Sequence, residues 1–160
     1  MSPAPEEMDV RWIQSVLPHR YPMLMVDRVL ELEPGKRITA VKSVSMNEPY
    51  FQGHFPGQPV VPGVLLIEGM AQAGGILLLY GVEDRSQKLL YFMSIERARF
   101  RRPVVPGDQL RYEVEILRMR STTCKLQGRA TVDGKLVAEV VCMSAMIDRD
   151  DDAGGTAWVG

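Results

Sequence analysis

The chain has 160 residues, of which 46% are hydrophobic and 24% charged, and its formal net charge at pH 7 is −1. This length is typical of one domain with a substantial buried core. The near-zero charge gives no indication of binding to nucleic acid or to an anionic membrane surface. The opening residues MSPAPEEMDV lack the basic and apolar regions of a secretory signal. We therefore expect a cytoplasmic globular protein, in which Cys124 and Cys142 are buried free thiols rather than a disulfide.

Short elements come first along the chain. Asp9 has the character of an N-cap for a helix over residues 10–17, which Pro18 ends. A second, longer helix is predicted from Pro62-Gly63 to about Tyr80. The remaining patterns are typical of strands, and they predict six of them: Met25–Glu33, Arg37–Ser45, Leu89–Arg101, Leu110–Met119, Thr122–Val132 and Leu136–Ile147.

The sequence also predicts two turns between strands and a flexible segment at each end of the chain. Pro34-Gly35 joins the first two strands, and Asp133-Gly134 predicts a tight hairpin between the last two. We expect a flexible N-terminus over residues 1–8, one domain over residues 9–147, and a disordered acidic, glycine-rich tail over residues 148–160.

The long helix is apolar on nearly every side. Between Val60 and Val82 the only charged or amide side chains are Glu68 and Gln72, and this length would span a bilayer. A carboxylate within the hydrocarbon is costly, however, and glycine and proline interrupt the run. A helix that is apolar all round must be covered on most sides. The sequence therefore predicts an α+β fold, in which an antiparallel sheet of about six strands wraps around one central helix.

Gly and Pro occupy six of eleven positions in the loop GHFPGQPVVPG, which runs from Gly53 to Gly63. Its histidine, His54, is suited to general base catalysis near neutral pH. The free N–H groups at the helix start, near Gly63, are suited to binding an oxyanion. Glu68 shares a helix face with Gln72, and apolar surroundings should raise the pKa of its carboxyl, so that it can donate a proton. Together these groups fit removal of a proton next to a carbonyl, with loss of a β-substituent.

Simpler interpretations of the same residues stay open at this point. A single histidine in a loop is often a hydrogen-bonding surface residue. A single glutamate in an apolar helix can pair with an arginine from elsewhere in the fold.

Several motifs resemble those of the bacterial (3R)-hydroxyacyl-[acyl-carrier-protein] dehydratases of type II fatty acid synthesis. They are NEPYFQGHFPGQPVVPGVLLIEGMAQAGG at residues 47–75, PHRYPMLMVDRV at 18–29, ARFRRPVVPGD at 98–108 and VDGKLVAE at 132–139. The resemblance covers about residues 9–147, and it implies a hot-dog fold and a carbon–oxygen lyase that acts in fatty acid biosynthesis.

The resemblance also implies roles for particular residues. His54 corresponds to the catalytic histidine, and Glu68 to a catalytic carboxylate supplied by the partner chain of a dimer. Val60 corresponds to the residue whose carbonyl holds the imidazole N–H, and Gly63 to the residue whose N–H bonds the thioester oxygen. A related group that also isomerises the double bond has Asp in place of Glu68, so the resemblance favours dehydration alone.

The implied partners follow from the same resemblance. The substrate is carried on the phosphopantetheine of acyl carrier protein, no metal or redox cofactor is needed, and the assembly is a homohexamer built as a trimer of dimers. Exposed basic residues are candidates for docking the carrier protein, or form a plain solvated strand edge: Arg97, Arg99, Arg101 and Arg102.

Further residues have two interpretations. Tyr91, Phe92 and Gln72 are candidates for lining or gating an acyl tunnel, and core packing explains Phe92 equally well. We interpret His19 as structural. Two other functions also fit a fold of this kind, namely an acyl-CoA thioesterase and a non-catalytic acyl-binding domain.

Overall fold

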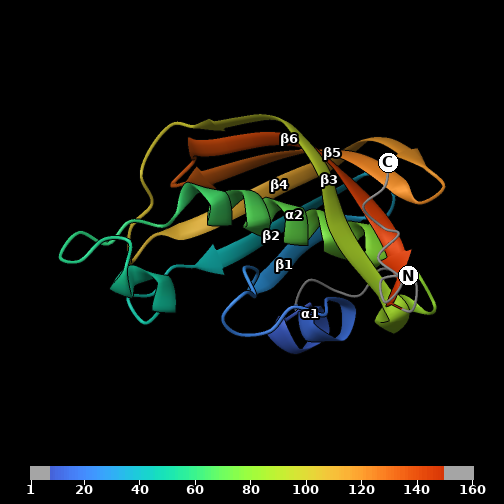
Figure 1. Ribbon diagram of the computed structural model, residues 1–160, viewed down its shortest axis with the longest axis horizontal. Coiled ribbons are helices and arrows are strands. Elements are labelled where there is room, and N and C mark those ends of the chain that lie inside the picture. The colour runs from blue at the N-terminus through green and yellow to red at the C-terminus, as the bar shows by residue number, and fades with distance from the viewer. Residues whose placement is uncertain (1–7, 150–160) are drawn as a thin grey trace.

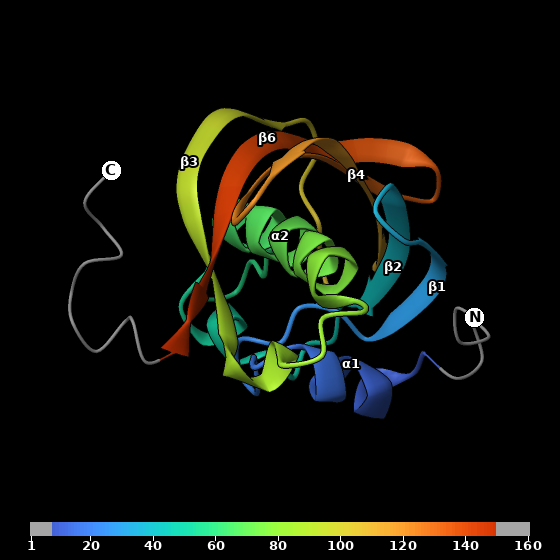
Figure 2. The ribbon, with the colours of Figure 1, turned by 90° about the vertical axis from the view of Figure 1, so that its right-hand side faces the viewer.

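The computed structural model describes residues 8–149, so the expectations for residues 1–7 and 150–160 lie outside the described range. A single antiparallel sheet curls around one long helix, α2, which fills the hollow of the sheet (Figures 1 and 2). The main elements are α1 Val10–Val16, β1 Arg28–Glu33, β2 Arg37–Ser43, α2 Gly63–Leu79, β3 Lys88–Phe100, β4 Gln109–Arg120, β5 Thr123–Val132 and β6 Lys135–Asp148. This is the predicted α+β architecture, with strand positions close to the predicted ones.

The strand order in the sheet is β1-β2-β4-β5-β6-β3, and every neighbouring pair is antiparallel. The predicted hairpin joins β5 to β6, where Asp133 and Gly134 have φ angles of 49° and 73°. Two successive positive φ angles are those of the type I′ turn that Asp-Gly favours. Strands β1 and β3 form the two edges, and β3 crosses in front of the helix in Figure 1.

Most residues of α2 are buried, because the sheet surrounds the helix. Two glycines allow the helix to lie close to the strands. A Cβ atom at Gly74 would lie 2.6 Å from Leu126 Cδ1, and one at Gly69 would collide with the hydroxyl of Tyr112. Within residues 8–149, no helix is both long and apolar enough to cross a membrane.

Both cysteines are buried and free, as predicted. They lie on the paired strands β5 and β6, where Cys124 is opposite Ser144 and Cys142 is opposite Leu126. Burial raises the pKa of each thiol to about 11. The reactive thiolate is therefore scarce at neutral pH.

The first strand begins later than predicted, at Arg28 instead of Met25. Met25 is buried, but its N–H donates to the side-chain oxygen of Gln72 on α2 at 2.8 Å instead of pairing with a strand. A tertiary contact with the central helix thus replaces the strand pairing that the alternating pattern predicted.

A buried ion pair connects β2 with the turn that precedes the His54 loop. Lys42 is 5% exposed, and its Nζ lies 2.7 Å from Glu48 Oε1 and 3.7 Å from Asp27 Oδ2. The Glu48 carbonyl accepts the N–H of Phe51 in the short 3-10 helix at Pro49–Gln52, directly before the loop. The ion pair therefore helps to fix the position at which the loop leaves the sheet.

We expect Glu48→Gln to lower the free energy of unfolding by about 3 kcal/mol, since the more distant Asp27 is then the nearest carboxylate to the buried Lys42 ammonium. Urea denaturation at fixed protein concentration measures this change. Glu113→Gln is the matched control, because its ion pair with Arg111 is exposed and contributes little. Equal stability losses in the two variants would contradict the prediction.

Candidate active site

His54 is held by its own loop. Its Nδ1 lies 2.7 Å from the Val60 carbonyl oxygen. The backbone closes the same loop, because Val60 N–H donates to the His54 carbonyl at 3.1 Å. The imidazole also stacks on Phe55, with ring centroids 3.9 Å apart. A carbonyl oxygen only accepts hydrogen bonds, so Nδ1 carries the proton and Nε2 keeps its lone pair.

The start of α2 lies beside this imidazole. Gly63 is the first residue of the helix, and the preceding Pro62 provides no side-chain cap. Among residues 8–149, no protein oxygen accepts the Gly63 N–H. A Cβ atom at Gly63 would lie 2.9 Å from Phe100 Cε1, so a larger residue here would have to displace the exposed Phe100 ring. His54 and Gly63 share one open depression of about 560 Å³, where a free N–H and a basic nitrogen face the same space.

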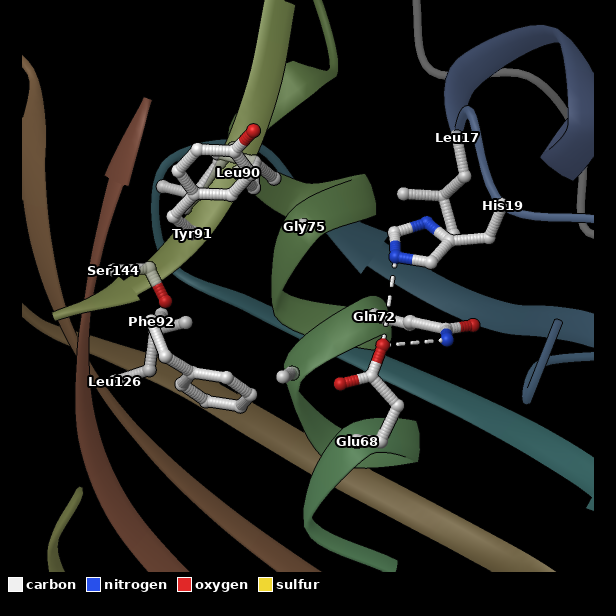
Figure 3. A pocket seen from close by; sticks show the side chains of 12 residues that line it. Leu17, His19, Glu68, Gln72, Gly75, Leu90, Tyr91, Phe92, Leu126 and Ser144 are labelled. Carbon is white, nitrogen blue, oxygen red and sulfur yellow. Dashed lines mark hydrogen bonds and ion pairs between the residues drawn. The ribbon is translucent and has the colours of Figure 1, made fainter. Parts of the chain in front are cut away.

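Glu68 lies in a different pocket, between α2 and the strands β3, β5 and β6 (Figure 3). It follows Gly63 by five residues, which turns its side chain about 140° around the helix relative to Gly63. The lining of the pocket is mainly apolar: Leu17, His19, Glu68, Ala71, Gln72, Gly75, Leu78, Leu90, Tyr91, Phe92, Leu126 and Ser144. Its volume is only about 40 Å³, which is room for about three water molecules.

Two side chains contact the Glu68 carboxylate, and both contact the same oxygen. Gln72 Nε2 donates to Oε1 at 2.9 Å, and His19 Nε2 lies 3.4 Å from Oε1 (Figure 3). Gln72 is 2% exposed and is itself held by backbone groups, because it donates to the Met23 carbonyl at 2.6 Å and accepts from Met25 N–H at 2.8 Å. The carboxylate is thus fixed by a residue one helical turn away and by one from the segment before β1.

The expected rise in the pKa of Glu68 is wrong. Partial burial raises the pKa of this carboxyl, but the hydrogen bonds from His19 and Gln72 outweigh burial, and the pKa lies below its ordinary value of 4.5. Hydrogen bonds to the charged form stabilise it. The partner suggested for a buried glutamate was an arginine, whereas the structure provides a histidine and an amide.

One chain does not bring His54 and Glu68 together. They line separate pockets, and no described hydrogen bond or ion pair joins them. Within one chain the two groups therefore belong to different cavities.

Comparison with known proteins identifies the family. The profile of the FabA-like domain matches residues 17–141. The 3-hydroxyacyl-[acyl-carrier-protein] dehydratase FabZ of Koribacter versatilis is 50% identical over 149 residues, which cover 93% of this chain and 96% of that protein. The protein of the same name from Bordetella pertussis is 55% identical over 145 residues, covering 88% of this chain and 96% of its own. The chain belongs to the FabZ dehydratase family.

Solved structures agree with the hot-dog fold of FabZ proteins. A chain of the dehydratase heterocomplex ApeI:P from Xenorhabdus doucetiae has a TM-score of 0.78 at 18% identity, covering 91% of this chain and 97% of that chain. The fluoroacetyl-CoA thioesterase FlK has a TM-score of 0.64 at 12% identity, and the match covers 79% of this chain and 96% of the FlK chain. At such low identity the likeness shows the fold alone, and this fold is shared by a dehydratase and a thioesterase.

Most of the other candidate residues line one of the two pockets, and Arg97 and Arg99 line neither. Tyr91, Phe92 and Gln72 line the Glu68 pocket. The four arginines of the proposed docking site, Arg97, Arg99, Arg101 and Arg102, are all exposed. Arg101 and Arg102 line the His54 depression, and Arg101 also pairs with Glu139 at 3.2 Å.

Sequence reasoning missed the part that His19 plays in this site. It interpreted His19 as structural, and the structure brings its imidazole to Glu68 across 49 positions of sequence. No local pattern indicates this contact, because it depends on how the segment before β1 packs against α2.

The lowered pKa of Glu68 predicts a pH-dependent contribution to stability. A carboxyl with a depressed folded-state pKa contributes stability above its unfolded pKa and loses it as the pH falls through the folded value. We expect the rise in unfolding free energy across pH 4.5 and below to be smaller in Glu68→Gln than in the wild type. Urea denaturation in buffers across this range measures the difference. Parallel curves for the two proteins would show that Glu68 has no depressed pKa.

Proposed function

We propose that this protein removes water from (3R)-3-hydroxyacyl groups carried on acyl carrier protein, in the cytoplasm, and forms trans-2-enoyl thioesters. In this proposal, His54 of one chain and Glu68 of a second chain carry out the chemistry. The observation that supports it most directly is the bond between His54 Nδ1 and the Val60 carbonyl, which leaves a basic Nε2 beside the free Gly63 N–H. The 3-hydroxyacyl-[acyl-carrier-protein] dehydratase names of the FabZ relatives give the substrate class.

His54 and Gly63 would act on the thioester end of the substrate. The thioester oxygen accepts the Gly63 N–H, and the positive end of the α2 dipole favours the negative charge that develops on this oxygen. His54 Nε2 takes the proton from the adjacent carbon. The stiff loop keeps base and oxyanion donor in one geometry, which is the condition for efficient proton abstraction.

Glu68 would act on the β-hydroxyl and protonate it as it leaves. The Glu68 carboxylate is ionised in the free chain, so it must take up a proton from solvent when the substrate and the second chain bind. An acyl chain and a second protein chain both remove water from around Glu68, and desolvation raises a carboxyl pKa. Loading therefore moves Glu68 toward the proton-bearing form that the step needs.

Exposed apolar side chains favour the involvement of a second chain. They gather on the edge strand β3 and beside the His54 depression: Met93 is 53% exposed, Ile95 47%, Phe100 52% and Val64 70%. An edge strand with such residues is an unprotected surface for pairing. A two-fold dimer through β3 covers it and forms two equivalent shared sites. By the family resemblance, three dimers assemble into a hexamer.

The acyl chain would enter the Glu68 pocket, whose present volume of about 40 Å³ does not hold one. Tyr91 and Phe92 lie on β3 at the wall of this pocket, so their movement is the proposed gate. The exposed arginines near the His54 depression carry the positive charge that suits an acidic carrier protein.

The test is incubation with 3-hydroxyacyl carrier-protein substrates of several chain lengths, with enoyl product and free thiol followed together. We expect enoyl formation without thiol release. His54→Ala and Glu68→Gln should each lower kcat by about 10²–10⁴-fold, as expected for a lost acid–base group.

Gln58→Ala is the matched control in the same loop, because Gln58 is exposed and bonds Phe55 through its backbone only. It should turn over as the wild type does. Thiol release by the wild type would favour a thioesterase. Full turnover by both His54→Ala and Glu68→Gln would overturn the proposed chemistry.

Mixing the two inactive chains tests the shared site. A mixed dimer of His54→Ala and Glu68→Gln has one site with both side chains intact. Random reassociation should therefore restore about a quarter of wild-type activity, because half of the dimers are mixed. Activity that stays at the level of the separate variants would place both groups of a site on one chain.

A further inference from the structure

His19 combines one charged contact with one unsatisfied nitrogen. Its Nε2 lies 3.4 Å from Glu68 Oε1, and its Nδ1 is buried with no hydrogen-bond partner among the described residues. A carboxylate oxygen only accepts, so the proton of a neutral His19 is on Nε2. The geometry therefore favours an imidazole that presents one fixed N–H to Glu68.

The backbone around His19 is also fixed. Arg20 lies over the end of α1, where its Nη1 donates to the Leu17 and His19 carbonyls at 2.8 and 2.7 Å, and its Nη2 donates to the Gln14 carbonyl at 2.9 Å. Further along the same segment, Gln72 bonds the backbone of Met23 and Met25. The segment that carries His19 is thus attached to α1 at one end and to α2 at the other.

The two donors leave the Glu68 oxygens unequal. Gln72 and His19 both approach Oε1, and no described hydrogen bond reaches Oε2. In Figure 3, the second oxygen points away from both donors, toward the side of the pocket where Phe92 lies. One oxygen is therefore held by the protein, and the other is open to the cavity.

We propose that His19 is a positioning residue which, together with Gln72, holds Glu68 Oε1, so that Oε2 is the oxygen that exchanges a proton with the substrate. This inference rests on the proposed function of Glu68. His19 does not touch the reacting atoms, and it acts by fixing the orientation of the carboxylate and by stabilising its charged form.

The direction of the pH effect follows from the groups around Glu68. The titratable residues of its pocket are His19 and Tyr91, to which the proposed dimer adds His54 of the second chain. Removal of the His19 donor raises the pKa of Glu68, since a hydrogen bond to the charged form is lost. The limb of the pH–rate profile that reports Glu68 then moves to higher pH, whether Glu68 acts as acid or as base.

The kinetic test compares His19→Phe with His19→Gln. Phenylalanine keeps a ring without the donor, and glutamine keeps a neutral N–H donor. We expect His19→Phe to lower kcat by about 10²-fold with little change in KM, as a misplaced catalytic group does. We expect the Glu68 limb to move to higher pH in the same variant, and His19→Gln to restore most of both properties.

The matched control is Tyr21→Phe, which removes a polar atom from an exposed aromatic side chain in the same segment. It should leave both kcat and the pH profile unchanged. The second comparison places His19→Phe in a Glu68→Gln background, where it should cause no further loss if His19 acts through Glu68. Losses that add in the double variant, or a pH profile that stays in place in His19→Phe, would overturn the inference.

A measurement without turnover separates this inference from the proposed function. In protein labelled with ¹³C at the glutamate carboxyl, the Glu68 resonance is identified by its absence from Glu68→Gln. It should titrate at higher pH in His19→Phe than in the wild type, and an unchanged titration would refute the contact. If the wild type forms no enoyl thioester, the proposed function fails, and the titration still decides whether His19 controls Glu68.

Discussion

Helix α2 is apolar around nearly all of its surface, and it also carries a carboxylate, Glu68, and a carboxamide, Gln72. The rest of the fold must cover the apolar surface and provide partners for these two polar side chains. The apolar surface needs cover, and a single curled antiparallel sheet provides most of it, together with α1 and the segment before β1. The two polar side chains need partners inside that cover, because a buried polar group without a hydrogen bond is destabilising. Gln72 meets this need with the backbone of Met23 and Met25, and Glu68 meets it with Gln72 and His19.

These contacts explain why the segment before β1 is not a strand. The Met25 N–H and the Met23 carbonyl pair with the Gln72 side chain. The first backbone bond to β2 comes from the Asp27 N–H to the Val41 carbonyl, and the strand begins at Arg28. The same contacts lower the pKa of Glu68, although its surroundings are largely apolar. The contacts from His19 and Gln72 that hold the Glu68 carboxylate in place thus also keep it charged. In the proposed function, this holds until a substrate and a second chain cover the pocket.

The geometry of the helix also determines how the two halves of the proposed site meet. Gly63 begins α2 beside His54, and Glu68 projects about 140° around the same helix axis. In the proposed function, each chain therefore offers half of a site on two different sides of the helix, and a second chain completes it.

The sequence by itself determined the elements and the candidate groups. Apolar periodicity predicted the strands and the covered helix, Asp133-Gly134 predicted its hairpin, and the GHFPG loop indicated His54 and Gly63. Only the tertiary structure decided the contacts of Glu68, the direction of its pKa, the role of His19 and the separation of His54 from Glu68. Periodicity reports which face of an element is buried, and it contains no information about which distant segment lies against that face. Apart from the Gln72 contact, which lies within one helical turn, the contacts that fix Glu68 and Gln72 join residues tens of positions apart, and they exist only once the sheet has closed around the helix.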